Sequence, residues 1–435
     1  MYGKNYLGYI IPEKYHEKEV LIDLAHKSGL KNPNCHYGKF YYTFHHLRTT
    51  PHLEKTNNDD GWVSMDTSVI KDVFGDLQYY NAIMDTLIAD KYVEPFISAE
   101  GKGSYSTKYH QCKKYRLTPL INEEPWSVIK VYGSNCKTTK NILDFYKQGL
   151  KPIDRHLFNL LTEFKIDNID FFDKTTAKNF TKFPCEMLDI IKEKVEKDKK
   201  KKIENIYNAY SDAYKFIKKD CFRFNVGRTG RRHTNITNLP KALRKYLYVL
   251  RNGKKQRLIV VDVVNCQVLL LLIILPEKLP TYKKFKQKVE DGVFYEFLAA
   301  GMGIVGEGEN GSLSEAQRKK VKNRYFKFIY GDHKYRFAKS SPVYKVMIKE
   351  FPDIVKFLEN KKNKQGYAKV AQLMQKAESD IIIHSVCKTA IGKKFLFTPI
   401  YDSIMCLPEN VNEIETIMTE AFKDKKMNVK LKIEQ

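Results

Sequence analysis

The segment from Ser314 to Gly331 constrains the chain most, because it combines a complete helix signature with a one-sided arrangement of charge. It reads SEAQRKKVKNRYFKFIYG, in which Ser314 and Gln317 have the form of a capping box and a glycine closes the segment. On a helix, residues four apart advance by only about 40°, so they share one face. The residues that recur at this spacing are Arg318, Lys322, Phe326 and Tyr330. We predict an α-helix that presents two cations and then two aromatic rings on one side.

Such a face suits a nucleoside triphosphate. Arg and Lys neutralise phosphate oxygens, and a flat aromatic ring packs against a base or a sugar. A basic helix by itself is usually a solvated surface, so this interpretation needs support from other parts of the chain.

The same pattern resembles the nucleotide-binding fingers helix of family A DNA polymerases and of the related single-subunit phage-type RNA polymerases. The resemblance implies three further features: an upstream carboxylate ending a buried strand, a polar helix downstream, and a second carboxylate in a hairpin after it. All three occur in this order, at Asp262, from Met374 to Ile382, and at Asp402.

The segment QRLIVVDVVNCQVLLLL contains the first carboxylate. Leu258 to Val261 form a buried-strand pattern, and an isolated buried carboxylate at the end of such a strand is costly unless a cation offsets its charge. The resemblance implies that Asp262 and the backbone carbonyl of Val263 hold Mg²⁺. It also implies that Gln267 lies beside the sugar of the incoming nucleotide, where family A DNA polymerases usually have Glu. This difference leaves the choice between deoxyribonucleotides and ribonucleotides open.

Three other segments carry the resemblance. FRFNVGRTGRRHTN contains the TGR sequence that precedes the first catalytic strand in family A DNA polymerases. The arginines of this segment, expected near primer or template phosphates, are Arg228, Arg231 and Arg232. LMQKAESDIIIHSVC resembles the family segment MQxxxxDII, which implies that Gln375 faces the minor-groove side of the primer end. KKFLFTPIYDSIMCLP predicts two strands around a tight turn that holds Asp402, with Tyr401 in place of the usual His and able to support the primer terminus.

The resemblance implies template-directed nucleotidyl transfer with two metal ions. Asp262 and Asp402 are expected to hold two Mg²⁺ ions, with Mn²⁺ as an alternative, roughly 3.5 to 4 Å apart. One ion lowers the pKa of the primer 3′ hydroxyl and the other stabilises the leaving pyrophosphate, to which Lys322 donates a proton. The residues expected to bind the nucleotide are Arg318, Lys322, Phe326, Tyr330 and Gln267.

We predict an α+β fold arranged as a right-hand polymerase with palm, fingers and thumb, preceded by an N-terminal helical or winged-helix-like region. The expected parts are residues 1–125 for the N-terminal region, 126–220 for a helical region with a candidate thumb, and 221–435 for the palm. Fingers are expected as an insertion at about 277–370, and no separate 3′ to 5′ exonuclease domain is evident. The resemblance covers about residues 221–435, half of the chain.

The N-terminal half gives weaker signals. A short helix near Ser68 to Phe74, a longer one from Leu77 to Ala89, and a hairpin centred on GKGS suit a winged-helix module, with a small helical lobe as the alternative. The hairpin lysines expected near phosphates are Lys102, Lys108, Lys113 and Lys114. Met187 to Asp220 predicts a long helical stretch, which the resemblance makes the candidate thumb, with a surface helix that has a solvated basic face as the alternative.

Composition indicates the kind of binding partner and the cellular compartment to expect. A formal net charge of +25 favours a polyanion, with nucleic acid preferred over an anionic membrane surface. The longest apolar run, Leu258 to Leu275, contains the polar residues Asp262, Asn265 and Gln267, so no membrane span is expected. Eight cysteines without a CxxC pair, and no secretory signal pattern, indicate reduced thiols and the cytoplasm, or a host cytoplasm for a phage protein. Richness in Lys, Asn, Ile and Tyr fits an AT-rich phage or plasmid.

Three functions remain at this point. A DNA polymerase is preferred because Phe326, the TGR segment and the MQ segment are of that type. An RNA polymerase or primase is the alternative, supported by Ser403 and Gln267. A non-catalytic DNA-binding replication initiator is the third, although the paired aspartates at positions 262 and 402 argue against it. The expected partners are a DNA primer-template or a single-stranded template and nucleoside triphosphates.

Overall fold

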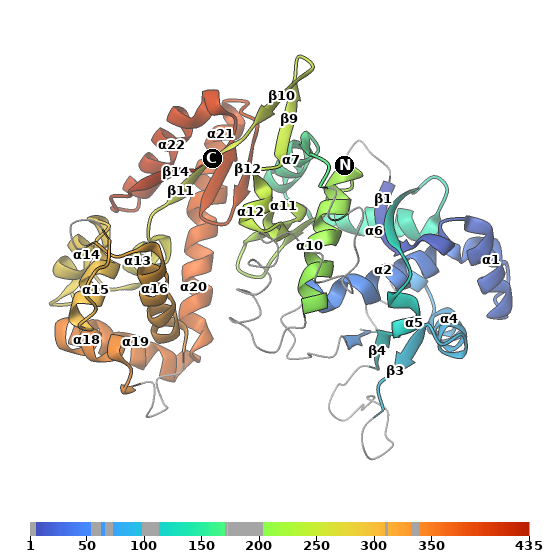
Figure 1. The fold of residues 1–435 in the computed structure, drawn as a ribbon, viewed down its shortest axis with the longest axis horizontal. Coiled ribbons are helices and arrows are strands. Elements are labelled where there is room, and N and C mark those ends of the chain that lie inside the picture. Colours follow the sequence, from blue (N-terminus) through green and yellow to red (C-terminus); the bar gives the residue numbers. More distant parts are fainter. Residues whose placement is uncertain are drawn as a thin grey trace. The chain divides into compact units, whose positions relative to one another are not determined.

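The computed structural model describes residues 6–53, 62–65, 73–97, 113–169, 172, 203–308, 312–331 and 339–434. These residues form helices and antiparallel sheets, which confirms a mixed helix and sheet protein (Figure 1). The chain divides into two compact units. Unit 1 comprises residues 1–224 and 234–256, and unit 2 comprises residues 225–233 and 257–435.

Unit 1 contains these elements, in chain order: β1 (Tyr6–Pro12), η1 (Glu13–Tyr15), α1 (Lys18–Lys27), η2 (Pro33–Cys35), α2 (Tyr37–Leu53), β2 (Val63–Ser64), α4 (Leu77–Ala89), β3 (Val93–Pro95), β4 (Lys114–Leu117), α5 (Pro119–Asn122), β5 (Trp126–Tyr132), α6 (Lys137–Gly149), α7 (Pro152–Leu161), β6 (Phe164–Ile166), α10 (Ile203–Lys218), α11 (Asn235–Asn238), α12 (Lys241–Arg244), β9 (Leu247–Arg251) and β10 (Lys254–Arg257). Strands β7 (Phe224–Val226) and β8 (Arg232–Thr234) pair with each other where the two units meet in sequence.

The core of unit 1 is rich in aromatic side chains. Strand β1 pairs antiparallel with β5, from Tyr6 opposite Tyr132 to Pro12 opposite Trp126. Helix α2 packs against β1 and buries Phe40 and Phe44 completely. Strand β5 begins the segment that the sequence predicts as a helical region over 126–220, so that prediction is wrong for these residues. These residues pair in register with β1 along their whole length, with Trp126, Val128 and Val131 buried.

Several N-terminal predictions are confirmed where the structure describes the residues. Helix α4 covers the predicted range, and β3 pairs antiparallel with β4 with Val93 opposite Leu117, as the hairpin requires. The middle of the hairpin, with Lys102 and Lys108, lies outside the described residues, as does most of the short helix at 68–74. Helix α10 supports the second half of the predicted stretch 187–220, whose first half is not described. The winged-helix and thumb assignments stay predictions.

Unit 2 contains β11 (Ile259–Val263), α13 (Cys266–Ile274), α14 (Tyr282–Glu290), α15 (Phe294–Gly301), α16 (Glu315–Tyr330), α18 (Pro342–Glu350), α19 (Pro352–Gln365), α20 (Ala368–Ser379), the π-helix η5 (Asp380–Cys387), α21 (Lys388–Gly392), β12 (Phe397–Ile400), β13 (Ser403–Cys406), η6 (Pro408–Asn410), α22 (Val411–Lys423) and β14 (Leu431–Glu434). Helix α20 and η5 form one continuous helical segment, since no residue separates them.

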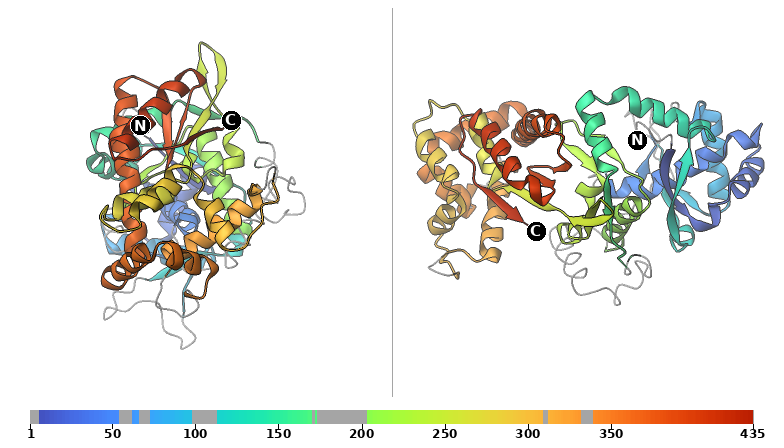
Figure 2. Two further views of the ribbon diagram at one scale, coloured as in Figure 1. Left: turned by 90° about the vertical axis from the view of Figure 1, so that its left-hand side faces the viewer. Right: turned by 90° about the horizontal axis from the view of Figure 1, so that it is seen from above.

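A four-stranded antiparallel sheet of order β12-β13-β11-β14 organises unit 2. Every side chain of β12 and β13 is buried, because α22 packs on η5 and β11, and η5 packs on β12 (Figures 1 and 2). The last pair of the β12–β13 hairpin is Ile400 opposite Ser403, so Tyr401 and Asp402 form the turn, as predicted. Helix α22 follows the hairpin, and strand β14 returns to pair antiparallel with β11.

The structure also gives the length and polarity of the helices and the state of the cysteines. No helix within the described ranges is long and apolar enough to cross a membrane. The described cysteines carry free thiols, and all of them except Cys35 are buried.

Candidate active site

Two aspartates lie at the same end of neighbouring strands in the unit 2 sheet. Asp262 of β11 is directly opposite Ser403 of β13, and Asp402 immediately precedes Ser403 in the hairpin turn. Opposed residues in an antiparallel pair have Cα atoms about 4.5–5.5 Å apart, so the two aspartates are near neighbours. Both aspartates act on the nearby thiol of Cys266. Burial raises the pKa of this thiol, and the negative charges of Asp402, Glu378 and Asp262 raise it further.

The turn aspartate is in an unfavourable setting for a negative charge. Burial raises the pKa of Asp402 to about 6, and the carboxylate of Glu378 adds to the rise, while Lys322 and Arg231 act in the opposite direction. An ionised Asp402 is therefore costly until further positive charge approaches it. The positive charge of Lys322 on α16 therefore acts on Asp402 and lowers the pKa of its carboxyl.

The donors at this end of the sheet suit a hard cation. The carboxylates of Asp262 and Asp402 and the carbonyl of Val263 are oxygen donors of the kind that Mg²⁺ takes in proteins. Across the described part of the chain, no group of three or more His, Cys, Asp or Glu side chains gathers to form a complete metal site. Substrate oxygens and water commonly supply the other ligands of protein-bound Mg²⁺.

Helix α16 has the two faces that the sequence predicts. Ser314 and Gln317 form both hydrogen bonds of a capping box, so the helix begins where the pattern indicates. The buried face consists of Val321, Tyr325, Phe328 and Ile329. On the predicted face, Lys322 is exposed, while Arg318, Phe326 and Tyr330 are half-buried. Partial exposure of all four leaves the face accessible to a ligand.

The arginine of this face is already fixed by protein groups. Arg318 forms an ion pair with Glu296 of α15 and donates to the side-chain oxygen of Asn265 at 3.3 Å and to the carbonyl of Gly292 at 3.4 Å. Asn265 caps α13 in a left-handed conformation, with φ 57°. The guanidinium position is thus tied to the turn that follows Asp262.

The far end of α16 is joined to the start of α13. The hydroxyl of Tyr330 donates to the amide oxygen of Gln267, and the amide nitrogen of Gln267 donates to Glu378 at 3.0 Å. Burial raises the pKa of Tyr330, so the phenol keeps its proton at neutral pH. These bonds hold two predicted nucleotide-binding residues together.

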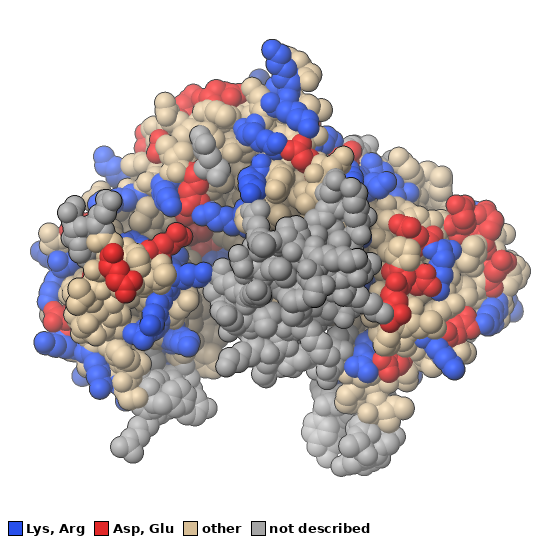
Figure 3. Space-filling model, in the orientation of Figure 1, with Lys and Arg blue, Asp and Glu red and all other residues tan. Residues whose placement is uncertain are grey.

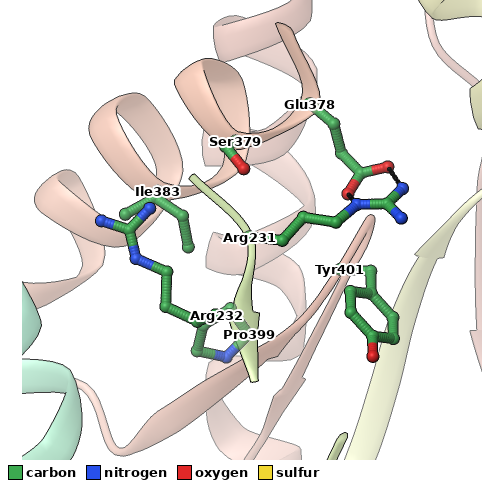
Figure 4. A pocket seen from close by; sticks show the side chains of 7 residues that line it. All are labelled: Arg231, Arg232, Glu378, Ser379, Ile383, Pro399 and Tyr401. Atoms are coloured by element: carbon green, nitrogen blue, oxygen red, sulfur yellow. Dashed lines mark hydrogen bonds and ion pairs between the residues drawn. The ribbon is translucent and has the colours of Figure 1, made fainter. Parts of the chain in front are cut away.

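The predicted primer-side residues separate into two groups. Arg231 makes a two-bond contact with Glu378, at 2.7 and 2.6 Å, and its guanidinium lies 5.2 Å from the centre of the Tyr401 ring (Figure 4). Arg232 instead points away from this pair and donates to the carbonyl of Gly230. Arg228 is exposed. The three arginines therefore do not form a single cluster.

Three of the predicted primer-side residues line a small pocket. It is lined by Arg231, Arg232, Glu378, Ser379, Ile383, Pro399 and Tyr401 (Figure 4). Gln375, one turn before Glu378, accepts a hydrogen bond from the hydroxyl of Thr229 at 3.2 Å, which links α20 to the TGR turn. Tyr401 has φ 58°, a left-handed conformation that is rare for a bulky residue and clusters at functional sites.

Sequence reasoning missed Glu378, which lies at the centre of these contacts. It falls between Gln375 and Asp380, at a position that the MQxxxxDII pattern leaves unspecified. Its side chain is only 1% exposed, and an acid that occupies a buried helix position is the signal that could have identified it. The π-helix η5 that follows is a second missed feature, of a type found often at functional sites.

Comparison with known proteins finds similarity among solved structures only. No family model matches the chain, and no curated protein matches it. Among solved structures, the chain is similar to the POL domain of Pol1 from M. smegmatis in complex with DNA primer-template and dNTP, with a TM-score of 0.37 and 12% sequence identity. The match covers 62% of this chain and 57% of that chain, so it spans little more than half of the length of that structure.

Proposed function

We propose that the protein is a template-directed nucleotidyltransferase of the DNA polymerase type. One observation carries the proposal: Asp262 of β11 lies opposite Ser403 of β13, and Asp402 is the turn residue that immediately precedes Ser403. Two acids beside a cationic helix face suit a reaction in which a triphosphate is bound and pyrophosphate leaves.

In this proposal the nucleotide lies along the exposed face of α16. Arg318 and Lys322 bind the phosphate oxygens, and Lys322 donates a proton to the leaving pyrophosphate. Phe326 packs on the base, while Tyr330 and Gln267 border the sugar. Because Arg318 is already held by Glu296 and Asn265, little side-chain freedom is lost when phosphate binds.

The primer end lies on the other side of the aspartates. Arg231 and Tyr401 contact it, with Gln375 on the minor-groove side. Their fixed contacts with Glu378 and Thr229 preorganise this surface. The primer 3′ hydroxyl is then directed at the phosphorus that Arg318 and Lys322 hold.

Magnesium fits the donor set of this site. Asp262, Asp402 and the carbonyl of Val263 would hold it, and when bound it would activate the attacking hydroxyl and stabilise the leaving phosphate oxygens. The raised pKa of Asp402 supports this role, because a carboxylate that is costly alone gains most from a bound cation.

The proposal assigns the parts of a right-hand polymerase to the elements of the chain. The sheet β12-β13-β11-β14 is the palm, the helices from α14 to α19 are the fingers, and α10 is the candidate thumb. The residues before α10 form an additional N-terminal region with a role in binding nucleic acid.

A nucleic-acid partner is also supported by the β9–β10 hairpin of unit 1. Its exposed cations are Arg251, Lys254, Lys255 and Arg257. The hairpin is the blue-tipped projection at the upper edge of Figure 3. Together with the net charge of +25, these cations provide phosphate contacts that do not depend on base sequence.

An RNA polymerase or primase is the second candidate. The amide of Gln267, which accepts from the hydroxyl of Tyr330, favours it, because it stands where family A DNA polymerases usually have Glu. Supplying the purified protein and Mg²⁺ with a primed template and either dNTPs or rNTPs distinguishes the two. We expect extension with dNTPs.

A replication initiator would give a different result. It would incorporate no nucleotide of either kind, and its binding to duplex DNA would survive removal of magnesium.

A further inference from the structure

Glu378 on α20 is a buried carboxylate that two different groups of predicted substrate-binding residues share. Its side chain is 1% exposed. Oε1 accepts from Nε of Arg231 at 2.7 Å, and Oε2 accepts from a terminal nitrogen of Arg231 at 2.6 Å and from Nε2 of Gln267 at 3.0 Å. One side chain therefore touches both the primer-side arginine and the nucleotide-side glutamine.

The chemistry of these donors fixes the direction of each bond. An ionised carboxylate only accepts hydrogen bonds, so Gln267 must turn its NH₂ group toward Glu378. The carbonyl of the same amide then faces Tyr330 and accepts its hydroxyl proton. The orientation of Gln267, and through it the position of Tyr330, depends on the charge of Glu378.

The arginine is fixed by the same carboxylate. The two parallel bonds with Glu378 orient the guanidinium plane above the Tyr401 ring. Only Nε and one terminal nitrogen donate to Glu378, so the second terminal nitrogen takes no part in this two-bond contact. A purely structural ion pair would not require Gln267 as a third donor.

We propose that Glu378 is a positioning residue that joins the nucleotide side of the site to the primer side. This inference rests on the proposed function. The primer side is the Arg231–Tyr401 pair, and the nucleotide side is the Gln267–Tyr330 pair. Glu378 holds these two pairs of side chains in a fixed relative position, so loss of its charge weakens the binding of both the nucleotide and the primer-template.

The test compares Glu378→Gln with Glu413→Gln in primer extension with dNTPs. The first change keeps the size of the side chain but leaves one oxygen acceptor for three N–H donors. The second removes the same charge from an exposed ion pair with Lys393, which has no part in the site. We expect Glu378→Gln to raise both the nucleotide KM and the primer-template Kd about tenfold, with kcat changed less than about threefold. Glu413→Gln should leave all three near those of the unaltered protein.

A rescue variant separates the two sides. In Gln267→Glu/Glu378→Gln, the carboxylate at position 267 accepts from Tyr330 and from the new amide at position 378. The nucleotide side then regains its bonds, while Arg231 still lacks its two-bond partner. We expect the nucleotide KM to recover and the primer-template Kd to stay raised.

Several results would overturn the inference. The first is a Glu378→Gln protein with the same nucleotide KM and primer-template Kd as Glu413→Gln. The second is a change in only one of these two constants. The third is a rescue variant in which both constants return to those of the unaltered protein. If the unaltered protein incorporates no nucleotide, the proposed function fails as well, which is a different outcome. If Glu378→Gln does not fold, the double variant Arg231→Gln/Gln267→Leu is compared with its two single variants. A nucleotide KM in the double variant that changes by the product of the two single changes would show that the residues act independently, which would contradict the inference.

Discussion

At the scale of single residues, Asp402 links stability to function. Its pKa is raised from 3.8 to about 6, first by burial and then by Glu378. An acid whose pKa is raised on folding is protonated more tightly in the folded state, so stability falls as pH rises from about 4 to 6. Above pH 6 the folded protein carries the full cost of the ionised group.

Replacement of Asp402 therefore has an unusual expected effect in the absence of divalent cations. Asp402→Asn should be more stable than the unaltered protein at pH 7 by up to about 3 kcal/mol, because the amide carries no charge. The gain should disappear near pH 4, where both proteins are neutral at this position. Chemical denaturation in EDTA at the two pH values measures the difference.

The matched control for this prediction is Asp424→Asn. Asp424 is exposed at the end of α22, and its replacement should change stability by less than about 0.5 kcal/mol at either pH. Equal effects of the two substitutions, or a destabilised Asp402→Asn at pH 7, would show that the setting of Asp402 is not as described.

At the scale of secondary structure, α16 gives the sharpest contrast between two faces of one helix. Lys322 lies on the face that is coupled to Asp402, whereas Lys320 is exposed about 160° away around the helix axis. We expect Lys322→Ala to lower kcat at least about 100-fold, because it removes a phosphate contact and a proton donor. Lys320→Ala should change kcat less than about twofold. Steady-state primer extension measures both, and equal losses would contradict the assignment of the face.

The sequence predicted α16 and the β12–β13 turn well, because both depend on local signals. A capping box, a four-residue repeat and two apolar runs around Tyr401 and Asp402 require no information from distant residues. Strand β5 was not anticipated, since its partner β1 lies more than 100 residues earlier. Glu378 was missed for the same physical reason: its partners come from the TGR turn and from α13, and only the folded chain brings them to α20.

At the scale of the whole molecule, the net charge of +25 predicts binding to nucleic acid that weakens as salt increases. The β9–β10 hairpin is expected to supply part of this binding. Arg251→Ala/Lys254→Ala should lower the slope of log K against log salt by about 2 in magnitude, one for each lost phosphate contact. The measurement is fluorescence anisotropy with duplex DNA over a range of salt concentrations.

The control for this prediction removes the same charge from another part of unit 1. Lys18, the first residue of α1, and Lys31, just beyond the end of α1, are exposed and lie outside the hairpin. Lys18→Ala/Lys31→Ala should leave the salt slope almost unchanged. Equal slopes for the two double variants would show that net charge, and not the hairpin, governs binding.

The central claim is that Asp262 and Asp402 act together in nucleotide transfer. The most direct measurement is primer extension with dNTPs and Mg²⁺ by the unaltered protein, Asp262→Asn and Asp402→Asn, with primer-template affinity measured on the same samples. We expect extension by the unaltered protein, a loss of at least about 1,000-fold in both variants, and an affinity for primer-template within about threefold. Extension by either variant at a rate close to that of the unaltered protein would contradict the claim.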